Sequence, residues 1–149
     1  KCIKRDYISL PKFGEFKLFI YKNLIDETEH LVLVKGKIKK TKSVLVRMHS
    51  LNIISDLLDL KNKDLEKSIE IISKNDHGVI VIVRNPHKEM KKKNSTPPQN
   101  RNNILKEYGV GAQILLDLGV KKIILLTKSS KNIVGIDGFG LEINGTKKI

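Results

Sequence analysis

The fold of this chain is indicated most clearly by the run YGVGAQILLDLGVKKIILLT, residues 108–127. Its first part spaces apolar side chains as on one face of a helix, and the pattern extends backwards to predict a helix over 104–120. Gly119 is the expected stop, because glycine readily adopts the left-handed conformation that closes many helices. The part KKIILLT, residues 121–127, is a short apolar run typical of a strand buried on both faces. A helix followed directly by an interior strand indicates an α/β fold.

The rest of the chain predicts more strands than helices. One further helix is expected over 64–74, closed by His77-Gly78, and a short one after Ser129 or Ser130 as N-cap. The alternating and apolar runs in the first half favour antiparallel pairing, beginning with a hairpin. We therefore expect an α/β fold with α+β character in the N-terminal half, built as a mixed sheet flanked by helices. The expected strands are residues 13–23, 30–38, 43–48, 78–83 and 141–147.

The length of 149 residues suits a single domain, 1–149. Residues 1–10 are expected to be the remnant of an interdomain linker. Residues 85–103 contain adjacent prolines, several asparagines and three consecutive lysines, and they predict a variable loop. A phosphate-binding role for Lys91–Lys93 is one interpretation of that run, and a solvated charged loop is the other.

The composition narrows the class of partner. The net charge is +13, yet all but four of the 29 basic residues are lysines and aromatic residues make up only 5%. Nucleic-acid sites use arginine forks and stacked aromatics, so we expect no nucleic-acid partner. No apolar run is long enough to cross a bilayer, and no signal peptide is visible, so we expect no membrane association. The single cysteine, Cys2, fits a cytoplasmic protein without disulfides.

Polar side chains follow the predicted interior strands, where α/β proteins place their chemistry. The strand SVLVRM has Arg47 next to its last residue and is followed by His49 and Ser50. The strand GVIVIV is followed by Arg84. Two interpretations of His49 stay open: a histidine hydrogen-bonded into the fold, or a catalytic group.

These stretches carry a family resemblance. Together, GEFKLFIYKN, EHLVLVKGKI, VLVRMHS, GVIVIVR and the run through LTKSSKNIVGIDGFGLEI resemble GTP cyclohydrolase II from about residue 10 to residue 143. The resemblance is particularly to the C-terminal half of the bifunctional riboflavin-biosynthesis proteins, whose N-terminal half is a 3,4-dihydroxy-2-butanone 4-phosphate synthase. The LPKFGEF stretch resembles the junction after that synthase. Since the chain also lacks an initiating Met, we expect it to follow a synthase domain in a longer protein.

The resemblance implies a chemistry and shows where this sequence departs from it. The family opens the imidazole ring of GTP with a zinc ion held by three cysteines, and it uses a tyrosine, an aspartate and an arginine. Its strand ends R-V-H-S-E-C, whereas here Leu51 replaces the glutamate and Asn52 replaces the first zinc cysteine. The later C-x-C pair has no counterpart in residues 57–64, and the catalytic tyrosine has none in the loop. The aspartate–x–arginine pair falls on Ile104 and Lys106.

The family's nucleotide site survives only in part. Its R-Q-E-G-R loop keeps just the first arginine, Arg84, and a family lysine falls on Asn132. The matching positions, which the resemblance assigns to a nucleotide-binding remnant, are Arg47, His49, Ser50, Arg84 and Thr127. We therefore expect no catalytic residue and no zinc. Other residues could in principle form a replacement metal site, but they show no spacing typical of metal ligands. These residues are His77, His87, Asp56, Asp59 and Asp64.

The sequence thus predicts a GTP cyclohydrolase II-like domain without that activity, serving a structural or regulatory role beside a synthase domain. The resemblance also implies a homodimer. The alternative is a divergent GTP cyclohydrolase II, or a domain that binds a nucleotide or phosphate through its remaining Arg, Thr and Lys side chains.

Overall fold

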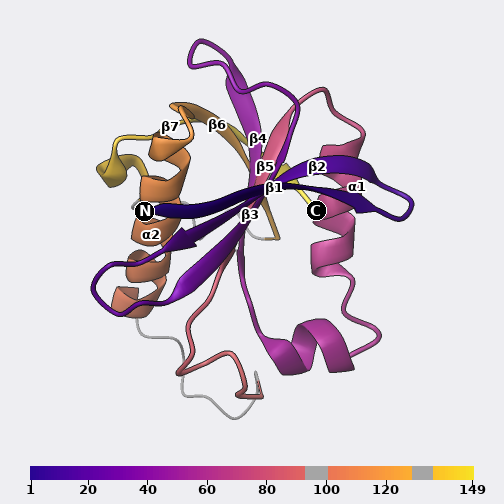
Figure 1. The fold of residues 1–149 in the computed structure, drawn as a ribbon, viewed down its shortest axis with the longest axis vertical. Helices are drawn as coiled ribbons and strands as arrows, with labels where there is room; N and C mark the ends of the chain where they lie inside the picture. The colour runs from indigo at the N-terminus through magenta and orange to yellow at the C-terminus, as the bar shows by residue number, and fades with distance from the viewer. Residues whose placement is uncertain (93–100, 129–135) are drawn as a thin grey trace.

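The computed structural model describes residues 1–92, 101–128 and 136–149. In these residues the strands form one sheet in the order β1-β2-β3-β5-β4-β6-β7 (Figure 1). The strands are β1 (Cys2–Leu10), β2 (Gly14–Lys22), β3 (Glu29–Lys35), β4 (Ser43–Ser50), β5 (Gly78–Val83), β6 (Lys122–Thr127) and β7 (Glu142–Lys148). The helical elements are the π-helical turn η1 (Ile54–Leu58), α1 (Asp64–Ser73), α2 (Arg101–Asp117) and the 3₁₀ turn η4 (Ile136–Phe139).

The sheet is antiparallel at one side and parallel at the other. β1, β2, β3 and β5 pair antiparallel in succession, whereas β4 pairs parallel with β5 and β6, and β6 with β7. The first half of the chain supplies the antiparallel side. The predicted α/β fold with α+β character in the N-terminal half is confirmed.

The helices cover opposite faces of the sheet (Figure 1). On one face Ala112, Ile114 and Leu115 of α2 pack with the buried valines of β3, β4 and β5. On the other face Ile72 of α1 packs with Phe16 and the alternate side chains of the same strands. All six residues of β5 are buried, as expected for a strand between two helical layers. Among the described helices, none is long and apolar enough to cross a membrane.

The C-terminus of α2 forms as the sequence predicts. Gly119 has φ +86°. Its N–H donates to Leu116 O at 3.0 Å, and Val120 N–H donates to Leu115 O at 2.9 Å. This pair of bonds is the Schellman motif, which turns the chain sharply from the helix into β6.

Several boundaries differ from the sequence prediction. Cys2–Leu10, expected in the linker remnant over 1–10, is strand β1, paired with β2 through a tight turn at Lys12 and Gly14. α2 begins at Arg101 inside the expected loop 85–103, because asparagine lowers helix stability without forbidding a helix. Gly78 does not close α1; it starts β5, where a Cβ atom would lie 2.7 Å from Ile72 Cγ2.

One element has no counterpart in the prediction. Residues 54–58 form η1, in which Asp59 N–H donates to Ile54 O at 3.0 Å. The short helix expected after Ser129 or Ser130 starts outside the described residues, which resume with η4.

Candidate functional site

The predicted polar residues gather at one edge of the sheet. β4 lies between β5 and β6 and runs parallel to both, so their carboxyl ends meet at the same edge. Leu51 N–H donates to Val83 O at 2.9 Å and joins the segment after β4 to the end of β5. The residues that the structure brings to this edge are Arg47, His49, Ser50, Arg84 and Thr127.

His49 is held by an aspartate from the turn that follows it. The His49 side chain is 7% exposed, and its Nε2 lies 2.8 Å from Asp56 Oδ2. The same carboxylate oxygen accepts the Asn52 backbone N–H at 3.0 Å. The Asp56 side chain is itself only 5% exposed. Histidine and aspartate therefore form a buried contact that fixes η1 against the end of β4.

Asn52, at the position where the family resemblance places a zinc cysteine, links two loops. Its Oδ1 accepts the Ser55 backbone N–H at 2.9 Å. Its Nδ2 donates to Lys91 O at 2.7 Å and lies 3.5 Å from Lys88 O. Next to it, Ile53 N–H donates to Glu89 O at 2.6 Å. Asn52 thus fastens the segment after β5 to the segment after β4.

Arg84, at the position of the family's substrate arginine, is engaged by an acid from its own loop. Arg84 Nη2 donates to Glu89 Oε1 at 2.9 Å, and its Nε donates to Oε2 at 3.2 Å. Glu89 is buried, and this two-point contact is the strong form of an arginine–carboxylate pair. The hydrogen bonds that the Arg84 guanidinium donates to Glu89 raise its pKa. His30 Nδ1 accepts the Arg84 backbone N–H at 3.0 Å.

Arg47 lies below this layer, within the protein. Its Nη1 donates to Leu126 O at 3.3 Å. Burial lowers the pKa of the Arg47 guanidinium, and the charge of Asp64, the hydroxyl of Tyr108 and the carboxylate of Asp56 oppose that shift. Burial likewise raises the pKa of the Tyr108 hydroxyl, which Arg47 lowers in turn. Acidic groups of several elements therefore partly offset the effect of burial on this guanidinium.

The other predicted positions differ in their surroundings. Ser50 is exposed at the end of β4, and Thr127 is half-buried at the end of β6. Ile104 and Lys106 lie in the first half of α2, and Lys106 is exposed. The pKa of the Asp26 carboxyl is lowered, first by hydrogen bonding from Thr28 and to a smaller extent by the charge of Lys106.

The residues considered for a replacement metal site lie apart. His77 Nε2 lies 3.2 Å from Ser43 O, at the opposite end of β4 from His49. His87 and Asp59 are exposed, and Asp64 forms an ion pair with Lys128. In the described parts of the chain, no three His, Cys, Asp or Glu side chains group closely enough to hold a metal ion.

The donor set around Asn52 does not fit the family's zinc. Zinc in proteins is held by thiolate, imidazole and carboxylate groups, and the neutral amide of Asn52 is occupied at both ends. Cys2 lies in β1, where its Sγ contacts Lys4 O at 3.5 Å. No chemical step through a metal follows from these side chains.

Sequence reasoning missed several members of this edge. The sequence assigns Glu89 only to a variable loop, and it offers Asp56 only as a candidate metal ligand. The sequence does contain a signal for the pairing of Glu89, since this acid follows Arg84 by five residues in a lysine-rich loop. His30 is buried, and its bond to Arg84 could not be predicted from the sequence.

Comparisons with known proteins place these features in a family. The sequence model of GTP cyclohydrolase II matches residues 2–148. The riboflavin biosynthesis protein RibBA of Synechocystis sp. is 34% identical over 154 residues, which cover 89% of this chain and 28% of that protein. The monofunctional riboflavin biosynthesis protein RIBA 2 of Arabidopsis thaliana is 35% identical, over 89% of this chain and 31% of its own length.

A further relative and one solved structure also match most of this chain. RibBA of Aquifex aeolicus is 34% identical over 88% of this chain and 37% of that protein, so this chain spans about a third of such relatives. The crystal structure of Cfl2 from Burkholderia cenocepacia has a similar fold, with a TM-score of 0.53 and 6% identity over 97% of this chain and 46% of that one. The match to the family model from end to end shows that this chain belongs to the GTP cyclohydrolase II family.

Proposed function

We propose that this chain is the GTP cyclohydrolase II-like domain of a riboflavin-biosynthesis protein and that it has lost GTP cyclohydrolase II activity. Its role is structural or regulatory, as the C-terminal domain of a cytoplasmic 3,4-dihydroxy-2-butanone 4-phosphate synthase. The family match and the names of the relatives support the pathway. The replaced residues at the carboxyl edge of the sheet support the loss of activity.

The observation that carries the proposal is how the site positions are used. Asn52, in place of a zinc cysteine, uses its side-chain amide for hydrogen bonds to the backbone of two loops. Arg84, which in the family would hold GTP, is bound at two points by Glu89. A substrate would have to break these contacts and would leave the buried Glu89 carboxylate without its arginine. The edge is therefore organised for its own stability.

Metal content tests the first half of this proposal. The purified chain is loaded with zinc, dialysed and measured by elemental analysis, beside a family member that keeps its cysteines. We expect far less than one zinc per chain here and about one in the control. Zinc near one per chain would mean that another donor set has replaced the cysteines.

The alternative, nucleotide binding without turnover, is supported by one feature of Arg47. Its buried Nε–H has no hydrogen-bond acceptor among the described residues, so the guanidinium keeps a donor for an anion. Titration calorimetry with GTP separates the two readings. Saturable binding that Arg47→Ala and Arg84→Ala both abolish would establish a nucleotide sensor, and no heat of binding supports the structural role. The control is Glu89→Gln, which weakens the contact between Glu89 and Arg84. It shows whether that contact alone prevents GTP from binding.

The proposed partners are a synthase domain of the same protein and a second copy of this chain. Sedimentation of the purified domain, alone and as part of the longer protein, tests both. A monomer in both forms would rule out the homodimer.

A further inference from the structure

The turn that follows the candidate site exposes large apolar side chains. Leu57, Leu58 and Leu60 are 67%, 71% and 80% exposed. They belong to η1 and the residues after it, the stretch in which the family resemblance expects the zinc-binding C-x-C pair. Exposed leucines grouped in this way are uncommon on a protein that works alone, because burying each one contributes about 1.5–3 kcal/mol.

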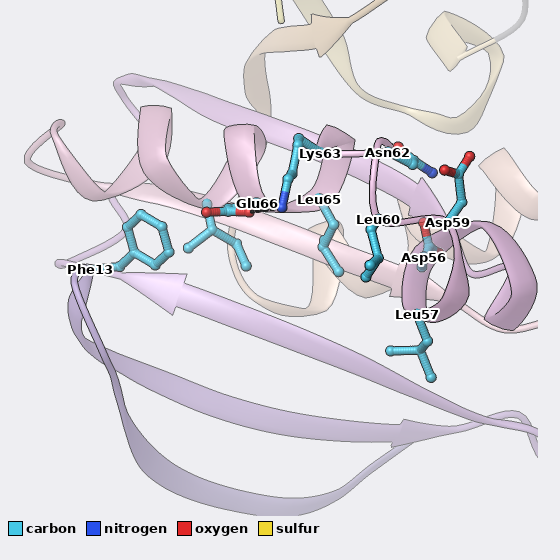
Figure 2. A pocket seen from close by; sticks show the side chains of 10 residues that line it. Phe13, Asp56, Leu57, Asp59, Leu60, Asn62, Lys63, Leu65 and Glu66 are labelled. Carbon is cyan, nitrogen blue, oxygen red and sulfur yellow. Dashed lines mark ion pairs between the residues drawn. The ribbon is translucent and has the colours of Figure 1, made fainter.

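Leu57 and Leu60 line a hollow, which we name the leucine groove. It runs between η1, α1 and the turn that carries Phe13, and its volume is about 260 Å³. Figure 2 shows Leu57, Leu60 and Leu65 pointing to the same side, toward the strands, with Phe13 at the far end. Its lining residues are Phe13, Asp56, Leu57, Asp59, Leu60, Asn62, Lys63, Leu65, Glu66 and Ile69. This volume is below the range of about 300–1,000 Å³ that holds drug-sized ligands, so it suits one or two side chains of a peptide.

The charge of the groove is opposite to that of the whole chain. Of the three carboxylates in the lining, Asp56 is buried against His49. Asp59 and Glu66 remain beside one lysine, Lys63, although the chain carries 29 basic and 16 acidic residues. Asp59 is exposed, accepts the Lys61 backbone N–H at 3.1 Å and has no ion-pair partner among the described side chains. Glu66 lies 3.5 Å from Lys63, and both remain about half exposed. A cationic peptide repelled elsewhere on the surface would find attraction here.

We infer that the leucine groove docks a basic amphipathic peptide segment of a partner protein, with leucine-like side chains in the groove and Lys or Arg beside Asp59 and Glu66. The inference rests on the proposed non-catalytic role and deepens it, because it names the chemistry of the partner that such a domain would hold.

A model peptide tests the docking directly. Fluorescence anisotropy is followed with a labelled peptide of leucine and lysine at amphipathic helical spacing. Two matched probes keep the pattern, one with glutamate for lysine and one with serine for leucine. We expect saturable binding of the leucine–lysine peptide alone. The double variant Leu57→Ser/Leu60→Ser and the charge reversal Asp59→Lys should each weaken it about tenfold or more.

Controls make the outcome specific. Leu24, in the turn between β2 and β3, is 72% exposed, and Leu24→Ser should leave binding unchanged. All these positions are exposed, so the variants should stay folded, which thermal unfolding verifies. Equal binding of the glutamate probe, or binding unaffected by the groove variants, would overturn the inference. So would a dimer of the chain that the double variant dissociates, since the groove would then hold a second copy.

The two proposals fail separately. Formate release from GTP would contradict the loss of activity while leaving peptide binding in place. Absent peptide binding in a chain that releases no formate would contradict the docking inference alone.

Discussion

The helix and strand of residues 108–127 differ from the edge of the sheet at which that strand ends. In its helix and strand, residues such as Leu115, Ile123 and Leu126 are at most 1% exposed and pack in the two cores. At the edge where that strand ends, the polar residues that match the family are joined by Asn52, Asp56 and Glu89, which hold them within the fold.

The difference follows from what each region has to satisfy. A core residue must fill a volume, and that demand remains whether or not the protein turns over a substrate. A site residue must meet its ligand, and when the ligand is lost its polar atoms need partners of their own. Under the proposed loss of activity, the framework stays recognisable while the polar side chains of the site take partners within the fold.

The largest effect is expected in the framework. Leu115→Ala, at a fully buried position of α2, should lower the free energy of unfolding by about 2–5 kcal/mol through the lost burial and the cavity that remains. Leu116→Ala is the matched control, since that neighbour is 37% exposed and should cost about 1 kcal/mol or less. Urea unfolding of both variants measures the difference. Equal losses would show that this face of α2 is not the packed one.

A smaller loss is expected at the rebuilt edge. Asn52→Ala removes the amide that joins Ser55 N–H to the Lys91 carbonyl, and it should destabilise the chain by about 1–3 kcal/mol. The segment 85–91 should also exchange its amide hydrogens faster. Asn144→Ala, which removes an exposed side-chain bond to Ser43, should cost about 0.5 kcal/mol. Unchanged exchange in 85–91 would argue against a link between the two loops.

Stability should depend on pH through His30. Burial lowers the pKa of His30 in the folded chain, and Arg84 lowers it further while Asp26 opposes the shift. The unfolded chain therefore takes up this proton more readily, so stability is complete above about pH 6.5 and falls as the pH drops below it. Protonation would also remove the acceptor for Arg84 N–H. Urea unfolding across this range should show a shallower fall in His30→Gln, and an identical fall in both proteins would exclude His30 as the cause.

The smallest effect is expected where a zinc ligand is put back. Asn52→Cys restores one family cysteine, but the family needs three, and residues 57–64 contain none. Zinc content by elemental analysis should stay at the level of the unaltered chain. An increase to about one zinc per chain would show that the edge still supplies other donors.

The framework could be predicted from sequence because its signals are local. The helix before Gly119 and the apolar run of β5 follow from spacing and composition. The edge could not be predicted in the same way, because its contacts join residues far apart in sequence, such as Asn52 with Lys91 and His30 with Arg84. The strand at Cys2–Leu10 was missed because its alternation is weak and most of its side chains are exposed.

Release of formate from GTP is the most direct test of the central claim. The purified chain, saturated with zinc, is incubated with GTP beside a family member that retains its three cysteines, and formate is measured over time. We expect formate from the control and none above the buffer background from this chain. Sustained, enzyme-dependent formate from this chain would contradict it and would mean that the rebuilt edge still catalyses ring opening.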